Sequence, residues 1–479
     1  MMDLRKCLVP AIYVLSALLI WAFAGNPPAV SSAGAGKPGL YRENGAPHTP
    51  HTPNRVTGRT INVLDYGADP RNNSTDDRPA IQAAIQAAKP GDEVYLPSGV
   101  YNLRSRLPGD QTAQLELKSG VNLRGQSESG TILLSSLDRV SGSKVIKIYG
   151  KNNIKISNLT VTSTFNRSFS SDYKMNNPSA GGPDYAIYIG QTNGSGSYNI
   201  TVDRVTVEKF RTTGIRISNS HDVIVRNSTF RNATDVGGGG AGYGVTVQGT
   251  AKTNLAGKPN DTYFNLVENN RFQGPYLRHA VVIQYYAHNN TVRGNTITNT
   301  ALASIDLHGE DEYLNEVYGN TINGPRVGAA IGVGNIGGSK PYDHDASGPG
   351  NLIRDNVISG AQMGILVYMG SPDTVIRGNT IKDSRIADGE GILIMNAPGT
   401  VIESNEIYNN TGPRFWGIKL SEDPGYQGRG RGIPRNIQLN DNRVYGNTGG
   451  VLVESGSYIY MRGNYIRNNA VADHVDARK

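Results

Sequence analysis

The feature that most constrains the fold is a short motif that returns throughout the second half of the chain. It consists of an apolar residue, two other residues, Asn, one further residue and a second apolar residue. Five of the seven steps between successive motifs are 22–26 residues long, and the other two are 36 and 37 residues long. A period this short predicts one coil of a solenoid for each motif. The repeating asparagines are Asn270, Asn295, Asn320, Asn356, Asn379, Asn405, Asn442 and Asn464.

Each repeat also holds a second segment in which apolar residues alternate with others. Residues 214–217, 304–307 and 391–394 show this alternation. A period of two predicts a β-strand that buries one face and turns the other outward. Leucine-rich repeats have a similar period, but their Leu-x-x-Leu-x-Leu spacing is absent. The patterns therefore predict an all-β chain folded as a parallel β-solenoid.

An asparagine at the same place in every coil has a structural explanation. Asn tolerates left-handed backbone angles at a turn, and its amide can hydrogen-bond to the Asn of the next coil. We therefore expect a ladder of asparagines that has no chemical role. The two long steps contain extra residues rich in Gly and Pro, at 337–350 and 422–434, and we expect these to leave the coil as loops.

The first residues have the pattern of a secretory signal. Arg5 and Lys6 precede a mostly apolar run over residues 7–21, and Ala22 and Ala24 form a small-x-small cleavage pattern. An uncleaved membrane anchor is the alternative, since the apolar stretch is barely long enough to span a bilayer. The expected division is a signal peptide over 1–24, a flexible Pro-rich linker over 25–60, a β-helix domain over 61–468 and a polar tail over 469–479.

The composition limits which cellular compartments and which binding partners we expect for the protein. Cys7 is the only cysteine, which excludes a disulfide framework and a cysteine-based metal site. Lys and Arg number 47 and Asp and Glu number 40, so the net charge is 47 − 40, or +7, which favours an anionic partner. The basic residues are not clustered as in a nucleic-acid-binding helix. We expect a secreted monomer, extracellular or in the cell wall, that acts on an acidic polysaccharide and contacts neither nucleic acid nor, after signal cleavage, a membrane.

The start of the predicted domain resembles the N-terminal cap of a known superfamily. Residues 61–68 precede an amphipathic helix that Asp76 or Asp77 can cap, and residues 94–101 have the pattern of strand, turn and strand. This arrangement is similar to that of the pectate-lyase-like right-handed β-helix superfamily. The apolar face of the helix holds Ile81, Ala84, Ile85 and Ala88.

The resemblance covers about residues 61–468 and implies a right-handed parallel β-helix with an N-terminal cap helix. The superfamily includes phage tailspikes, polygalacturonase-related hydrolases, polysaccharide lyases and mannuronan C5-epimerases. One such fold supports many chemistries, so the function has to come from the site residues.

One coil departs from the neutral outward positions of its neighbours. Asp306 and His308 are two residues apart on a predicted strand, so both point to the same face. In the following coil, Gly332 and Gly334 would leave a groove beside them, and a loop with Asp343, His344 and Asp345 can overhang it. A hydrogen-bonded turn is the purely structural alternative. The preceding coil supplies Arg278, His279, Gln284, Tyr285, Tyr286 and His288.

The segment Asp306-Leu307-His308 resembles the Asp-Pro-His strand of mannuronan C5-epimerases, with Leu in place of Pro. Gly309 follows His308, and the acidic residue is displaced to Glu310. The resemblance implies abstraction of the C5 proton of a uronic acid, either as an epimerase or as a lyase, after the substrate carboxylate is neutralised. The catalytic candidates are Asp306, His308, Tyr285, Tyr286, Arg278 and Glu310. The substrate-binding candidates are His279, Gln284, His288, Tyr368, Trp416 and Lys419.

Three alternatives remain open at this stage. Glu310, Asp311 and Glu312 form either a solvated turn or a set of Ca²⁺ ligands, and otherwise we expect no cofactor. A glycoside hydrolase could use paired carboxylates among Asp306, Glu310 and Asp311. A non-catalytic cell-surface protein that binds carbohydrate would need only exposed aromatic residues.

Overall fold

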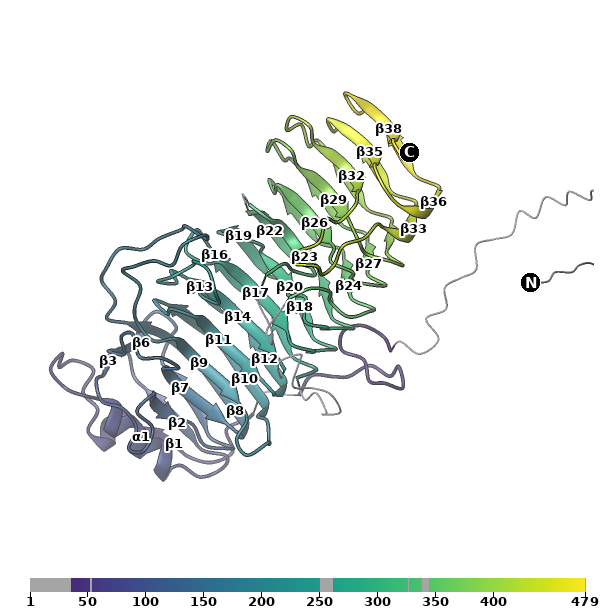
Figure 1. Cartoon of the computed structure of the whole chain (residues 1–479). Helices are drawn as coiled ribbons and strands as arrows, with labels where there is room; N and C mark the ends of the chain where they lie inside the picture. The colour runs from purple at the N-terminus through teal and green to yellow at the C-terminus, as the bar shows by residue number, and fades with distance from the viewer. Residues whose placement is uncertain (1–35, 52–53, 250–261, 326, 338–343, 479) are drawn as a thin grey trace, which may run out of the picture. The chain divides into compact units, whose positions relative to one another are not determined.

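The strands of the chain stack coil upon coil in the order of the sequence, as the labels in Figure 1 show. The computed structural model describes residues 36–51, 54–249, 262–325, 327–337 and 344–478, which belong to one compact unit. The expected signal peptide and the first part of the expected linker lie outside the described residues. Among the residues described, no helix is both long and apolar enough to cross a membrane.

One face of the stack is a sheet to which each coil contributes a single strand. All described pairings in this sheet are parallel, and this sheet carries the outward positions considered above. Its thirteen strands are β4 (Ala113–Glu116), β7 (Lys144–Tyr149), β9 (Tyr185–Gly190), β11 (Thr213–Ser218), β14 (Tyr243–Gln248), β17 (His279–Gln284), β20 (Ile305–Leu307), β23 (Ala329–Val333), β26 (Met363–Val367), β29 (Glu390–Ile394), β32 (Trp416–Leu420), β35 (Gly449–Val453) and β38 (Ala472–Asp476).

The remaining faces of the stack count as one second sheet of twenty-five strands, because the two long strands β8 (Asn152–Ser163) and β10 (Tyr198–Glu208) each continue round the corner from one face to the next. Asn158 and Arg204 have positive φ angles of 58° and 55° at these corners. The strands are β1 (Thr60–Asn62), β2 (Glu93–Leu96), β3 (Gly99–Leu103), β5 (Asn122–Gly125), β6 (Thr131–Ser135), β8 (Asn152–Ser163), β10 (Tyr198–Glu208), β12 (His221–Arg226), β13 (Thr229–Arg231), β15 (Leu266–Glu268), β16 (Arg271–Gln273), β18 (Thr291–Arg293), β19 (Thr296–Thr300), β21 (Glu316–Tyr318), β22 (Thr321–Pro325), β24 (Leu352–Arg354), β25 (Val357–Ser359), β27 (Val375–Arg377), β28 (Thr380–Lys382), β30 (Val401–Glu403), β31 (Glu406–Tyr408), β33 (Arg435–Asn440), β34 (Arg443–Tyr445), β36 (Ser457–Arg462) and β37 (Tyr465–Arg467).

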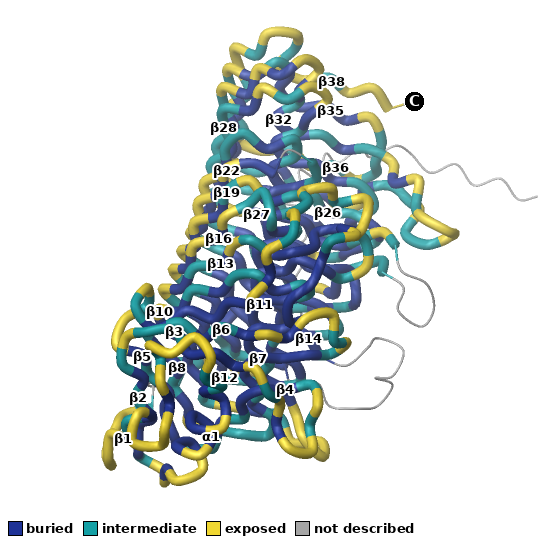
Figure 2. Tube along the Cα trace, turned by 90° about the vertical axis from the view of Figure 1, so that its left-hand side faces the viewer, coloured by how far each residue is buried: buried dark blue, intermediate teal, exposed yellow. Residues whose placement is uncertain are grey.

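The core runs inside the coils, where like residues stack in register. Ile305 lies between Val281 and Ile331, and all three side chains are fully buried. Figure 2 shows this interior as the dark blue part of the tube. The intervening residues point outward, so Asp306 lies in register with Val282 on one side and Gly332 on the other. The expected all-β fold with parallel coils is confirmed.

The predicted asparagine ladder is present. The Oδ1 atom of Asn320 accepts hydrogen bonds from the backbone nitrogen of Asn295 at 3.0 Å and from its Nδ2 at 2.9 Å, and Asn320 repeats both bonds with Asn356. A second ladder, which we did not predict, includes Asn290 and Asn315. Its asparagines precede those of the first ladder by five residues, a spacing visible in the sequence.

The N-terminal cap consists of the 3-10 helix η1 (Val63–Tyr66) and the helix α1 (Arg78–Ala87). Ile81, Ala84 and Ile85 are buried, as the amphipathic pattern predicts. Asp77 precedes the helix, but its carboxylate does not cap it. It accepts hydrogen bonds from the backbone nitrogens of Asp69 and Asn102, both at 2.7 Å, and so ties two other segments to the cap.

The flexible linker expected over 25–60 does not hold for residues 36–51 and 54–59, which pack along the coils. The side-chain nitrogen of Asn289 donates to the carbonyl groups of Lys37, Gly39 and Tyr41 at 2.9–3.1 Å. The Nε2 atom of His48 lies 2.6 Å from a carboxylate oxygen of Asp222. A Pro-rich segment has no regular structure of its own, but here side chains of the coils bind its backbone. We name residues 36–51 and 54–59 the N-terminal strap.

The polar tail expected over 469–479 is also corrected, because it contains the last strand. β38 pairs with β35 in parallel, and Val475 lies in register with Leu452. The sequence of 472–476 does not alternate between polar and apolar residues, and the strand is largely exposed at the end of the stack. The described coils therefore continue to residue 476.

Candidate active site

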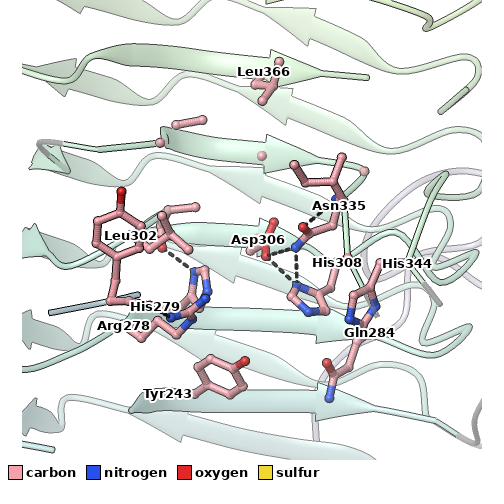
Figure 3. A pocket seen from close by; sticks show the side chains of 18 of the residues that line it. Tyr243, Arg278, His279, Gln284, Leu302, Asp306, His308, Asn335, His344 and Leu366 are labelled. Atoms are coloured by element: carbon pink, nitrogen blue, oxygen red, sulfur yellow. Dashed lines mark hydrogen bonds and ion pairs between the residues drawn. The ribbon is translucent and has the colours of Figure 1, made fainter. Parts of the chain in front are cut away.

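A large cavity of about 1290 Å³ lies over the outer face of the thirteen-stranded sheet. Successive outward positions form its floor, because the coils are in register. Figure 3 shows the side chains that converge there. The floor includes Arg216, Thr246, Asp306, Gly332 and Leu366.

Asp306 and His308 form a hydrogen-bonded pair in this cavity. The alternation of β20 buries Ile305 and Leu307 and turns both polar side chains to the outer face. The Nδ1 atom of His308 lies 2.6 Å from Oδ2 of Asp306, and the amide nitrogen of Asn335 donates to the same oxygen at 3.1 Å. With Nδ1 donating to the carboxylate, Nε2 carries the lone pair of the neutral ring.

The two groups change each other's proton affinity. Burial alone would lower the pKa of His308, but the negative charges of Asp306 and Glu310 raise it above its ordinary value. Burial alone would raise the pKa of Asp306, but the positive charge and hydrogen bond of His308 lower it. The neighbouring carboxylates therefore make His308 a stronger base than a free histidine.

His344 completes this corner of the cavity. Its Nδ1 atom lies 2.5 Å from a carboxylate oxygen of Glu310, and its ring centroid lies 4.5 Å from that of His308. The expected overhang is thus present for His344, whereas Asp343 lies outside the described residues. A Cβ atom at Gly309 would lie 2.4 Å from the carbonyl oxygen of Asp345, so glycine allows the loop to reach the turn.

The acidic turn after His308 matches neither of its two alternatives, a solvated turn or a set of three Ca²⁺ ligands. Glu312 is fully buried, and its carboxylate accepts hydrogen bonds from the backbone nitrogens of Gly309 and Glu310, both at 2.9 Å. Burial raises its pKa to about 8, and the nearby charge of Glu310 adds to this effect. Glu312 therefore closes the turn. Within the acidic trio, only Glu310 lies close to other side chains that could bind a metal ion, and these are His308 and His344.

Arg278, His279 and Gln284 also line the cavity. Arg278 donates through Nη1 to the carbonyl groups of Tyr173 and Val236 at 2.7 and 2.9 Å. Burial lowers the pKa of His279 to about 3, so its ring stays neutral, and Nδ1 lies 2.7 Å from the carbonyl oxygen of Ala303. Gln284 donates to the side-chain oxygen of Gln248 at 2.7 Å.

Of four other candidates, two line the cavity and two do not. Tyr285 and Tyr368 line the cavity, whereas Tyr286 is not among the lining residues. His288 lies away from the cavity, and its ring stacks on Tyr313 with centroids 4.7 Å apart. Tyr285 and Tyr286 both have positive φ angles, of 54° and 60°, so the chain turns a corner between β17 and His288. This turn explains why the assignment of His288 to the site was wrong.

Trp416 and Lys419 line a second, smaller cavity of about 340 Å³. Lys419 lies in register with Leu393 and, through Leu366 and Gly332, with Asp306. Four coils place it about 19 Å from Asp306. Its ammonium group lies 3.9 Å from Glu390 and 3.3 Å from Glu454. Burial raises the pKa of Glu390 to about 7, against the opposing effect of Lys419.

Sequence reasoning missed two members of the main cavity. Tyr243 lies in register with His279 at the start of β14, and burial raises its pKa to about 12. Asn335 follows Gly334 and holds Asp306. Tyr243 begins the strand that also holds Thr246, so the register of the strands could have indicated it. Nothing in the sequence indicates that the amide of Asn335 turns back toward Asp306.

Stacked parallel coils with a long cavity over one sheet define a protein of the parallel β-helix class. A family model described as the right handed beta helix region matches residues 336–478, in agreement with the expected hand. The model described as "Rhamnogalacturonase A/epimerase, pectate lyase-like" matches residues 60–330, more than half of the chain. The chain belongs to this family.

Two curated relatives match over short segments. A mannuronan C5-epimerase of Azotobacter vinelandii is 40% identical over 108 residues, which are 21% of this chain and 8% of the epimerase. Rhamnogalacturonase A of Aspergillus aculeatus is 40% identical over 77 residues, which are 16% of this chain and 17% of that enzyme. The matches thus span less than a fifth of the length of either relative.

Solved structures share the fold at low sequence identity. The A-module of another Azotobacter vinelandii mannuronan C-5 epimerase has a TM-score of 0.52 at 20% identity, over 87% of this chain and 99% of that one. The catalytic unit of an α-1,3-glucanase from Streptomyces thermodiastaticus has a TM-score of 0.60 at 17% identity, over 88% and 71%. A surface adhesin of Streptococcus pneumoniae has a TM-score of 0.60 at 16% identity, over 88% and 100%.

Proposed function

We propose that this protein is a polysaccharide-processing enzyme that removes the C5 proton of a uronic-acid residue, as a lyase or as a C5-epimerase. The observation that carries the proposal is the Asp306–His308 pair, joined at 2.6 Å on the floor of a cavity large enough for several sugar residues. The C5 proton of a uronate is weakly acidic, so its removal needs a positioned base and a group that neutralises the adjacent carboxylate.

His308 is the base in this proposal. Asp306 holds the Nδ1 hydrogen and fixes the orientation of the ring, and the Nε2 lone pair takes the proton. Asn335 supports the pair through Asp306, since its amide nitrogen donates to Oδ2 of that carboxylate at 3.1 Å. Asp306 and Asn335 are positioning residues, and His308 is the catalytic residue.

The same cavity supplies the cationic and hydroxyl groups that the reaction needs. The guanidinium groups of Arg216 and Arg278 line the cavity and suit a carboxylate, because they present several donors in one plane. Burial keeps the phenols of Tyr243 and Tyr368 protonated by raising both pKa values. Either phenol can return a proton to C5 or protonate the leaving oxygen.

The relatives support this substrate class. Two of them are named for mannuronan epimerisation, and a polysaccharide family 6 lyase specific for mannuronic acid shares the fold with a TM-score of 0.52. The net charge of +7 suits a polyanion. We place the enzyme outside the cell, where its expected signal peptide would direct it and where such polymers occur.

A hydrolytic mechanism fits the cavity less well. Most glycosidases use two carboxyl groups that flank the scissile bond. Of the described carboxylates that line the cavity, Asp306 is bound to His308, and Asp423 accepts backbone hydrogen bonds from Met369 and Gly425, both at 2.8 Å. Both carboxylates are therefore committed to the protein.

A panel of uronans tests the proposal with three readouts on the same samples. Absorbance of the unsaturated product reports a lyase, a changed sugar ratio by proton magnetic resonance reports an epimerase, and reducing ends without absorbance report a hydrolase. We expect one of the first two signals, and we expect it to be lost in His308→Ala. The matched control is His288→Gln, which changes a histidine outside the cavity. Reducing ends alone, or no change of any uronan, would contradict the proposal.

A further inference from the structure

Three side chains from two distant segments converge beside the cavity floor. The ligand atoms of His308, Glu310 and His344 all lie within 4.8 Å of one another. Glu310 is fully buried, and His308 is nearly so. Figure 3 shows the rings of His308 and His344 side by side. Neither the reaction proposed above nor the closure of the acidic turn gives Glu310 and His344 a role.

We propose that these three side chains bind one divalent transition-metal ion of the Zn²⁺ type. Two imidazole nitrogens and one carboxylate oxygen are ligands typical of Zn²⁺ and its neighbours in the first transition row. Ca²⁺ instead takes six to eight oxygen ligands. Nitrogen and oxygen ligands together therefore favour a transition metal, whereas the acidic trio in the sequence suggested Ca²⁺.

The surroundings of His308 match those of a histidine that binds metal. Such a histidine usually donates its second ring N–H to a carboxylate, which fixes the ring and strengthens the ligand nitrogen. Asp306 is in this position, 2.6 Å from Nδ1, and Asn335 holds Asp306 in turn. Nε2 is then the nitrogen available to a metal.

The backbone presets the position of His344. The nitrogen of Asp345 donates to the carbonyl group of Gly309 at 2.8 Å, and the nitrogen of Asp311 donates to Ala346 at 3.1 Å, so the loop is joined to the turn on both sides. Arg429 donates to the carbonyl group of His344 at 2.9 Å from the opposite loop. Ligands held in this way lose little conformational freedom when they bind an ion.

Charge also favours a cation at this point. Glu310 and Glu312 are both fully buried and lie two residues apart on one turn. A buried carboxylate is costly unless a cation compensates it. A divalent ion beside Glu310 supplies two positive charges at the place where the buried acidic side chains gather.

This site shares His308 with the proposed reaction, and on this point the inference rests on the proposed function. A metal ion on Nε2 occupies the lone pair that would take the C5 proton. Metal binding and proton abstraction therefore compete, and saturating Zn²⁺ should lower turnover of the uronan by at least about a hundredfold, the scale on which a general base contributes.

The test titrates chelator-treated, full-length protein with Zn²⁺ alone, by calorimetry and by metal analysis after dialysis. We expect one equivalent per chain, and we expect His344→Gln and Glu310→Gln each to weaken binding by at least about tenfold. His288→Gln should bind as wild type does. The melting temperature of each metal-free variant checks its fold, and His344→Gln, which changes a loop residue, decides the matter if Glu310→Gln fails to fold. No binding by wild type, or unchanged binding by His344→Gln, would overturn the site.

Activity with and without Zn²⁺ separates this inference from the proposed function. Turnover in the metal-free protein that falls on addition of Zn²⁺ supports both. Turnover that appears only with Zn²⁺ supports the metal site and overturns the role of His308 as the base. One bound equivalent with no turnover in either state supports the metal site and contradicts the proposed reaction. Turnover without any Zn²⁺ binding overturns the metal site alone.

Discussion

The carboxylate of Asp306 and the imidazole of His308 meet at 2.6 Å. Asp306 is the central residue of β20, and His308 directly follows this strand, where its backbone nitrogen still donates to Ile283 of the preceding coil at 2.9 Å. The neighbours of Asp306 in register are Val282 and Gly332, so one side of the pair is apolar and the other open. A reactive pair on such a rigid floor is held in place before substrate binds.

Removal of either member of this pair should abolish most of the activity. We expect His308→Ala and Asp306→Asn each to lower turnover of an acidic polysaccharide by at least about a hundredfold, the usual scale for a lost general base. The inward residues of β20 are unchanged in both variants, so both should fold, which the melting temperature will show. A purely structural role predicts the reverse, with lost stability and ordinary activity in the folded fraction.

The asparagine ladder should contribute measurably to stability. Asn320→Leu leaves the side-chain nitrogen and the backbone nitrogen of Asn295 without their acceptor. We expect a loss on the order of 1–3 kcal/mol in the free energy of unfolding, the cost of unsatisfied buried groups. The control is Asn323→Leu, which changes an exposed asparagine of β22, the strand that follows Asn320. An unchanged denaturation midpoint for Asn320→Leu would show that the ladder is not stabilising.

The buried carboxyl group of Glu390 predicts a pH dependence of stability. Its pKa is about 7 in the folded chain and 4.5 in its ordinary state, because burial disfavours the charged form. The folded state then holds more protons between these values, so this group's contribution to stability is present below about pH 4.5 and is lost as the pH rises to about 7. Lys419, Glu454, Asp388 and Arg414 line the same cavity and modulate the effect.

Unfolding by denaturant at several pH values checks this prediction. Glu390→Gln should flatten the dependence between pH 4.5 and about 7, and Glu422→Gln, which changes an exposed carboxylate, should leave it as in wild type. Equal slopes for wild type and Glu390→Gln would refute the assignment. An upper limit for the effect is roughly 1.4 kcal/mol for each pKa unit, before discounting for solvent.

Gly309 should tolerate no side chain. It has a φ angle of +72°, and a Cβ atom would lie 2.4 Å from the carbonyl oxygen of Asp345. Gly309→Ala should therefore lose on the order of 1–3 kcal/mol of stability and displace the loop that carries His344. The matched control is Gly109→Ala, at a φ angle of +80° with no atom near the added carbon. Equal losses in the two variants would mean that the backbone angle alone matters.

The regular part of the fold could be predicted because it repeats. Alternation in residues 304–307 identified the outward pair, and the register of the strands then aligned Asp306 with Gly332 and Lys419 as expected. His344 is found only through topology, since it belongs to a long excursion that returns to the turn at Gly309. His288 was misplaced because two tyrosines adopt positive φ angles, which tyrosine rarely does and no pattern indicates.

The N-terminal strap could not be predicted for a different reason. Composition indicates that a Pro-rich segment lacks its own regular structure, but it does not indicate whether other residues bind the segment's backbone. Here the amide of Asn289 supplies three hydrogen bonds at one place. That information belongs to the folded surface of the coils and not to the segment.

The strap has a mechanical consequence. In a solenoid each coil touches only its neighbours, so coils can detach one after another from an end. The strap joins Gly39 to Leu314, His48 to Asp222 and Asn54 to Asn122. It therefore crosses many coils in the direction of the stack. A coil in the middle cannot separate from the next unless the strap also detaches, so the coils should unfold together and not one at a time.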